Sequence, residues 1–168
     1  MNELGMLETM AGYSRWMNEK LYGACAAMSD TERKRDVKIF FGSIHATLNH
    51  ILLADRVWLG RLAGRPFEVA SLDQELYAEF ESLADARRAT DHQIQDTVAG
   101  LNADRLDEPI SYRSISGRQP AERSRGLILL HMFNHQTHHR GQITAAMTQL
   151  GYDFGVTDLI ASPFAVVP

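Results

Sequence analysis

The chain reads Gly126-Leu-Ile-Leu-Leu-His131-Met-Phe-Asn-His135-Gln-Thr-His138-His139-Arg-Gly-Gln142 near its carboxyl end, with four of its seven histidines inside nine residues. Apolar side chains in and around this segment recur every three or four residues, a spacing that predicts an amphipathic helix over residues 121–150. Gly151 is placed to end that helix. The histidines are therefore expected on a helix that packs into the core.

Two of these histidines, His135 and His139, are four residues apart and so share one face of the predicted helix. On a helical wheel they fall in the middle of the apolar arc, whereas His131 and His138 lie at its edge. Buried imidazoles need polar partners, and the neutral ring is a common ligand for transition metals. The pair is a candidate chelate, although two hydrogen-bonded core histidines would give the same pattern.

A second predicted helix, residues 39–63, supplies a third histidine. It is apolar on most faces, as a buried helix is, and Gly64 and Pro66 end it. His45 and His50 are five residues apart, so only one of them can face a given site. The wheel neighbours of His50 are mainly apolar, which points His50 inward and leaves His45 on the polar edge.

His50, His135 and His139 together form a candidate three-histidine metal site with an open coordination position, as in catalytic zinc centres. Imidazole selects weakly among first-row divalent ions, so Zn²⁺ and Ni²⁺ are the leading candidates. His131, His138 and Gln142 are candidates for hydrogen-bonding groups around the ligands. The Glu that a metalloprotease needs in H-E-x-x-H is missing from this segment, which disfavours proteolysis.

The remaining sequence predicts two more long helices, over residues 3–28 and 71–100. Ser71 or Asp73 is expected to cap the latter. A charged loop over 30–38, a hairpin or irregular loop over 102–120 and a tail over 152–168 complete the chain. The polar middle of the 71–100 helix, with Arg87, Arg88 and His92, is expected to face solvent, and Cys25 to be a core residue. The expected fold is an all-α four-helix bundle, one domain over residues 1–168.

Composition narrows the functional classes. The 168 residues are 45% hydrophobic and 23% charged with a net charge of −4, typical of a globular protein. There is no basic block for a nucleic acid and no apolar segment of about 18 residues for a membrane. The one cysteine excludes an internal disulfide and favours a reducing compartment, so we expect a cytoplasmic protein.

Two segments carry a family resemblance. The histidine segment His131–Gln142 and the segment Phe40-Phe-Gly-Ser-Ile-His-Ala-Thr-Leu-Asn-His50-Ile-Leu-Leu-Ala-Asp-Arg-Val-Trp58-Leu resemble the DinB family, part of the wider DinB/YfiT-like superfamily of metalloenzymes. The resemblance runs from Tyr13-Ser-Arg-Trp16 to Asp158-Leu-Ile. It implies a four-helix bundle, usually a homodimer, with His50, His135 and His139 as the metal ligands.

The resemblance leaves the chemistry open. It implies a metal-dependent hydrolase or a transferase that uses a low-molecular-weight thiol such as bacillithiol, mycothiol or glutathione. The expected partners are then a small-molecule substrate or thiol and a second copy of the chain. One alternative is a non-catalytic metal-binding stress-response bundle; another is a structural bundle whose core histidines are hydrogen-bonded to one another.

Overall fold

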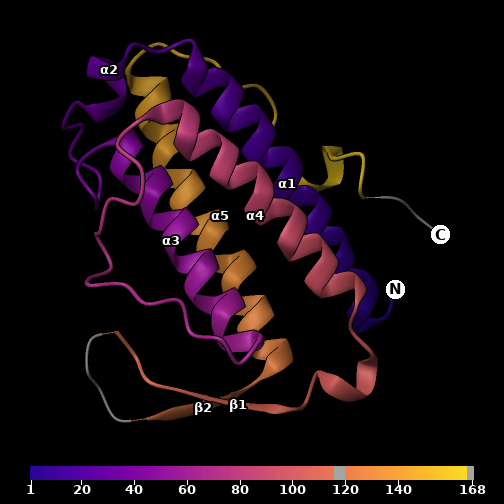
Figure 1. Ribbon diagram of the computed structural model, residues 1–168. Helices are drawn as coiled ribbons and strands as arrows, with labels where there is room; N and C mark the ends of the chain where they lie inside the picture. Colours follow the sequence, from indigo (N-terminus) through magenta and orange to yellow (C-terminus); the bar gives the residue numbers. More distant parts are fainter. Residues whose placement is uncertain (116–119, 166–168) are drawn as a thin grey trace.

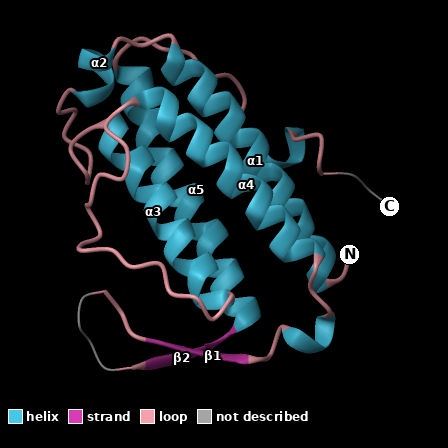
Figure 2. Cartoon of the chain, in the orientation of Figure 1, coloured by secondary structure: helices cyan, strands magenta, loops and turns pink. Residues whose placement is uncertain are grey.

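Four long helices pack side by side in the computed structural model, which describes residues 1–115 and 120–165 (Figure 1). A short antiparallel hairpin lies across one end of the bundle (Figure 2). The long helices are α1 (Glu3–Ala26), α3 (Ile44–Leu62), α4 (Phe80–Ala99) and α5 (Arg125–Gln149); the smaller elements are α2 (Asp30–Lys34), η1 (Ala103–Arg105), β1 (Pro109–Tyr112), β2 (Ala121–Ser124) and η2 (Leu159–Ala161). The predicted four-helix bundle is confirmed. Among the described residues, no helix has the length and apolar character needed to cross a membrane.

The connections determine which helices are neighbours. The chain runs along α1, returns along α3, and then reaches the start of α4 through a long crossover segment, residues 63–79, so that α3 and α4 point the same way (Figure 1). The hairpin then carries it to α5, which runs antiparallel to both. α1 packs chiefly against α4, and α3 chiefly against α5. The α3–α5 contact brings the predicted ligand helices together.

The helix that was predicted over residues 71–100 begins nine residues later, at Phe80, and neither Ser71 nor Asp73 caps it. Leu72 and Leu76 match helical spacing but lie in the crossover segment. The Asn49 side chain on α3 explains the difference, because its Oδ1 accepts hydrogen bonds from the backbone N–H groups of Leu76 and Tyr77, both at 2.9 Å. These bonds hold the crossover in a non-helical path against α3.

Three other boundaries also differ from the predictions. The helix predicted from residue 39 begins at Ile44, because Gly42, with a φ of +80°, closes a turn before the Ser43 cap. The helix predicted from residue 121 begins at Arg125, because residues 121–124 pair with β1. The segment 30–38 contains the short helix α2, capped by Ser29. Of the two predictions for residues 102–120, a hairpin or an irregular loop, the structure shows the hairpin, although its second strand lies just beyond residue 120; residues 116–119, including Gly117, lie outside the described part.

The core is divided into two apolar clusters by a layer of buried polar side chains halfway along the bundle. All four long helices contribute to this layer, which we call the mid-bundle polar layer. Its members are Ser14 and Asn18 from α1, Asp55 from α3, Arg87 and Asp91 from α4, and Gln136 and Arg140 from α5, each at most 4% exposed. The prediction that Arg87 faces solvent is therefore wrong.

Asp55 is the hub of this layer. Its two carboxylate oxygens accept hydrogen bonds from the Nη1 of Arg87 at 2.6 Å and from the Nε2 of Gln136 at 2.9 Å. Asp91 lies 2.9 Å from Arg87 Nη2, an ion pair without hydrogen-bond alignment, and accepts a bond from Asn18 at 2.9 Å. Arg140 donates to Gln136 at 3.2 Å, and burial lowers its pKa to about 10. The two acids and two bases balance in charge, as a buried ionic cluster requires.

Gly60, near the end of α3, lies directly against the crossover backbone. A Cβ at this position would be 2.7 Å from the carbonyl oxygen of Arg65 and 2.8 Å from the amide nitrogen of Phe67. We expect Gly60→Ala to lower the free energy of unfolding by about 1–3 kcal/mol, because backbone atoms cannot move aside locally. Gly23→Ala on α1, where a Cβ meets nothing within 4 Å, should be neutral or stabilising by up to ~1 kcal/mol. Urea unfolding of both variants measures the difference, and equal values would contradict the expectation.

Candidate metal centre

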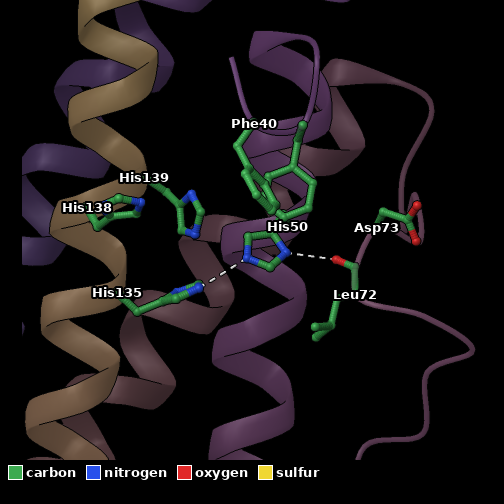
Figure 3. A pocket seen from close by; sticks show the side chains of 8 residues that line it. Phe40, His50, Leu72, Asp73, His135, His138 and His139 are labelled. Atoms are coloured by element: carbon green, nitrogen blue, oxygen red, sulfur yellow. Dashed lines mark hydrogen bonds between the residues drawn. The ribbon is translucent and has the colours of Figure 1, made fainter. Parts of the chain in front are cut away.

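Three histidines from two helices converge near the middle of the α3–α5 contact (Figure 3). His50 comes from α3, and His135 and His139 come from successive turns of α5. One ring nitrogen from each lies within 4.8 Å of the others, and the Nε2 atoms of His50 and His135 are 3.1 Å apart. Two nitrogens bound at about 2.0–2.1 Å to one tetrahedral metal lie roughly 3.3 Å apart. The three rings therefore have a spacing that could hold one metal ion.

The His50 ring is oriented by the crossover segment. Its Nδ1–H donates to the carbonyl oxygen of Leu72 at 2.8 Å (Figure 3). A carbonyl can only accept, so Nδ1 carries the proton and the lone pair is on Nε2, which faces His135. Metal-binding histidines are commonly fixed in this way by a hydrogen bond at the other ring nitrogen.

The His139 ring is oriented by its own helix. Its Nδ1–H donates to Gln142 Oε1 at 3.0 Å, which leaves Nε2 free to bind a cation. The Gln142 amide in turn donates from its Nε2 to the exposed His138 at 3.1 Å. The predicted candidates Gln142 and His138 thus form a short chain behind His139. His131 is also exposed, and its ring packs edge-on against Trp58 at 5.2 Å and near His135 at 5.8 Å.

Burial keeps the candidate ligands uncharged at neutral pH. It lowers the pKa of His50 to about 4 and that of His135 to about 3, with the neighbouring histidines adding a smaller effect in the same direction. Burial also lowers the pKa of His139. Neutral imidazoles present lone pairs, and lone pairs 3.1 Å apart repel unless a proton or a cation lies between them. This arrangement suits a bound cation.

An open pocket of about 750 Å³ adjoins the three histidines (Figure 3). Phe41 forms one wall and stacks on His50, with ring centroids 3.9 Å apart. Phe40 is 79% exposed beside it, and Leu72, Asp73 and His138 complete the lining. A volume of this size accommodates a small organic molecule next to the ligands.

Two features of this site were not predicted. Phe41 was assigned to the interior of a helix, but the turn closed at Gly42 places it on the His50 ring. The Leu72 carbonyl is a backbone group, which no residue type marks in a sequence. In the sequence, only the Phe40-Phe41 pair close to His50 could have indicated an aromatic wall at this site.

The other singled-out residues lie away from the site. His45 does not face it, as predicted, but it is 1% exposed rather than on a polar edge, and its Nε2 lies 2.9 Å from the Tyr77 carbonyl oxygen. His92 is exposed on α4, and Cys25 is fully buried in an apolar cluster; both predictions are confirmed. Burial raises the pKa of Cys25 to about 12, which makes it a poor nucleophile.

Comparisons with known proteins give a consistent result. The family model described as "DinB family" matches residues 1–165. "Protein DinB" of Bacillus subtilis (strain 168) is 26% identical over 157 residues, which cover 87% of each chain. A crystal structure of a DinB-like protein from Bacillus cereus ATCC 10987 superposes with a TM-score of 0.62 at 21% identity, covering 84% of this chain and 90% of the other. At that identity the superposition supports the fold alone.

Proposed function

The chain belongs to the DinB family, and from that premise we propose that it binds one divalent transition metal, Zn²⁺ or Ni²⁺, through His50, His135 and His139. The observation that carries the proposal is the spacing of the three ring nitrogens, all within 4.8 Å of one another in a pocket wall. The Nδ1–H groups of His50 and His139 donate to Leu72 and Gln142. The Nε2 lone pairs of these two rings are therefore available for a metal ion.

We further propose that the site serves a thiol-dependent transferase. A bound divalent metal would offer an open position and lower the pKa of a thiol there towards neutrality. Phe40 and Phe41 would shelter that position, and the pocket of about 750 Å³ leaves room for a thiol and a small electrophile together. The thiolate sulfur would bond to an electrophilic carbon, whose leaving group departs with the electron pair.

Asp73 favours thiol transfer over metal-dependent hydrolysis. A hydrolase benefits from a general base near the attacking water, and Asp73 is the carboxylate that lines this pocket within the described ranges. A hydrogen bond from Ser71 lowers the pKa of Asp73, which makes it a weak base at neutral pH. The pocket itself favours either enzyme over a non-catalytic metal-binding bundle. We also propose that the protein is cytoplasmic, in keeping with its single cysteine, and homodimeric, as its family implies.

The test uses protein purified without a histidine tag and stripped of metal. Titration with Co²⁺ should saturate at one ion per chain, and glutathione or bacillithiol should then produce a thiolate-to-cobalt charge-transfer band. S-Methylglutathione, which has no free thiol, should not. Failure to bind Co²⁺, Zn²⁺ and Ni²⁺ would refute the metal site. Stoichiometric metal with no band for any low-molecular-weight thiol, mycothiol included, would refute the transferase.

A further inference from the structure

A second, smaller cavity of about 280 Å³ lies beside the metal pocket. The two share His50, Leu72 and His135 as lining residues, so a ligand in the small cavity has one end next to the candidate metal ligands. Its far walls come from the last turns of α3, which contribute Trp58 and Arg61, and from the hairpin, which contributes Tyr112. A cavity below the roughly 300 Å³ typical of drug-sized ligands suits a short chemical group.

Arg61 is held rigidly at the far end of this cavity. Its guanidinium carbon lies 4.4 Å from the ring centroid of Trp58 and 4.6 Å from that of Tyr112. The two rings are nearly perpendicular, with their centroids 5.0 Å apart. Its Nη2 donates to the carbonyl oxygen of Arg113 at 2.9 Å. These contacts hold the charged group in place before any ligand arrives.

The charge of Arg61 is not neutralised by an acidic side chain in the part of the chain that the structure describes. Arg125, by contrast, is buried and pairs with Glu108 at 2.9 Å. Partial burial lowers the pKa of Arg61 because water is withdrawn from the cation. A desolvated guanidinium with unused N–H donors gains most from an anionic ligand.

The shape of the Arg61 environment selects among anions. Trp58 and Tyr112 both lie within 4.6 Å of the guanidinium carbon, and an edge of the guanidinium carries two parallel N–H groups that match a planar carboxylate. The rest of the lining includes Ala54 and Val57, which would contact hydrocarbon. A carboxylate on a short apolar chain fits both features.

We propose that Arg61, Trp58 and Tyr112 form a carboxylate-binding site and that the substrate at the histidine centre is a small organic acid. This proposal adds a substrate class to the proposed function. It rests on that function in one respect, namely that the end of the substrate opposite the carboxylate reacts at the histidine centre. The carboxylate site itself can be tested without any metal, because Trp58 lines the cavity and reports on its occupancy.

The experiment uses Trp16→Phe protein, in which Trp58 is the one remaining tryptophan of the two in the sequence. Metal-free protein is titrated with hexanoate and with hexanamide, a neutral molecule of the same shape, while Trp58 fluorescence is recorded. Hexanoate should bind about 10- to 100-fold more tightly, the effect of one charge-assisted hydrogen-bonded pair. Arg61→Gln should abolish this preference, and Arg61→Lys, which keeps the charge but lacks the planar fork, should retain only part of it.

Arg88→Gln is the matched control, because Arg88 is an exposed arginine on α4 that pairs with Asp85. It should preserve the preference for hexanoate. Equal affinity for hexanoate and hexanamide, or a preference that survives Arg61→Gln in protein with an unchanged circular dichroism spectrum, would overturn the proposal. If the wild-type protein binds hexanoate but no cobalt, the metal centre is refuted and the carboxylate site is supported.

Discussion

Replacing His135 with alanine should lower the affinity for Zn²⁺ or Co²⁺ by at least about 100-fold. Loss of a group that only hydrogen-bonds to a metal ligand already lowers metal affinity by about 10- to 100-fold, and His135 is itself one of the three proposed ligands. In wild-type protein, metal at 100 times its Kd adds about 2.7 kcal/mol to the free energy of unfolding. For a chain of 168 residues that corresponds to a Tm increase of roughly 5–11 °C. The same metal concentration should raise the Tm of His135→Ala by no more than about 1–2 °C. Calorimetry with and without chelator measures both effects.

Two further variants make this prediction specific. His92→Ala removes an exposed histidine on α4 and should retain the full metal-dependent increase in Tm. Gln142→Ala removes the partner of His139 and should weaken binding by about 10- to 100-fold without abolishing it. If the histidines served only to stabilise the fold, His135→Ala would lower the Tm in the presence of chelator, and wild type would not respond to metal. That outcome would support a purely structural role.

Asp55→Ala should be the most destabilising single substitution in the mid-bundle polar layer. It leaves Arg87 as a buried cation with Asp91 as its one acidic partner, and it removes the acceptor for Gln136. Breaking a buried ion pair by removing one partner costs about 3–5 kcal/mol. The Tm should therefore fall by roughly 6–20 °C. Asp55→Asn keeps an acceptor for Gln136 but loses the charge, so its loss of stability should be smaller.

Asp85→Ala is the appropriate comparison, because Asp85 pairs with Arg88 on the exposed face of the same helix as Arg87. Exposed pairs contribute about 0–1 kcal/mol. Urea unfolding at neutral pH compares the variants directly. A loss for Asp55→Ala no larger than that for Asp85→Ala would show that the layer contributes little to stability.

Much of the fold and of the candidate site could be predicted, because both depend on helical periodicity. The apolar spacing identified all four long helices, and on α5 the wheel separated His135 and His139 from the exposed His131 and His138, although on α3 it wrongly assigned the buried His45 to a polar edge. His50 could be joined to His135 and His139 because each lies on the buried stripe of its own helix. Periodicity assigns a residue to a face, and for these three residues the face determines the neighbours.

The unpredicted features depend on contacts between residues far apart in the chain. Arg87 lies in a polar stretch of α4 and matched a solvated face, because its partner Asp55 is on another helix. The crossover segment kept helical spacing at Leu72 and Leu76, yet Asn49 captures its backbone amides. Phe41 gained its position from a turn with a left-handed glycine. Local pattern contains no information about such partners.

The mid-bundle polar layer also determines the axial register of the helices. Apolar ridges between α3 and α5 could repack after a slide of one helical turn, about 5.4 Å, with little loss of buried area. Such a slide would carry Gln136 away from Asp55 and break the bond from Gln136 Nε2 to Asp55 Oδ1, a loss that apolar contacts alone would not impose. His135 is the residue next to Gln136, so the same bond that prevents the slide holds His135 level with His50. The mid-bundle polar layer, none of whose members lines the metal pocket, therefore sets the axial spacing of the three histidines.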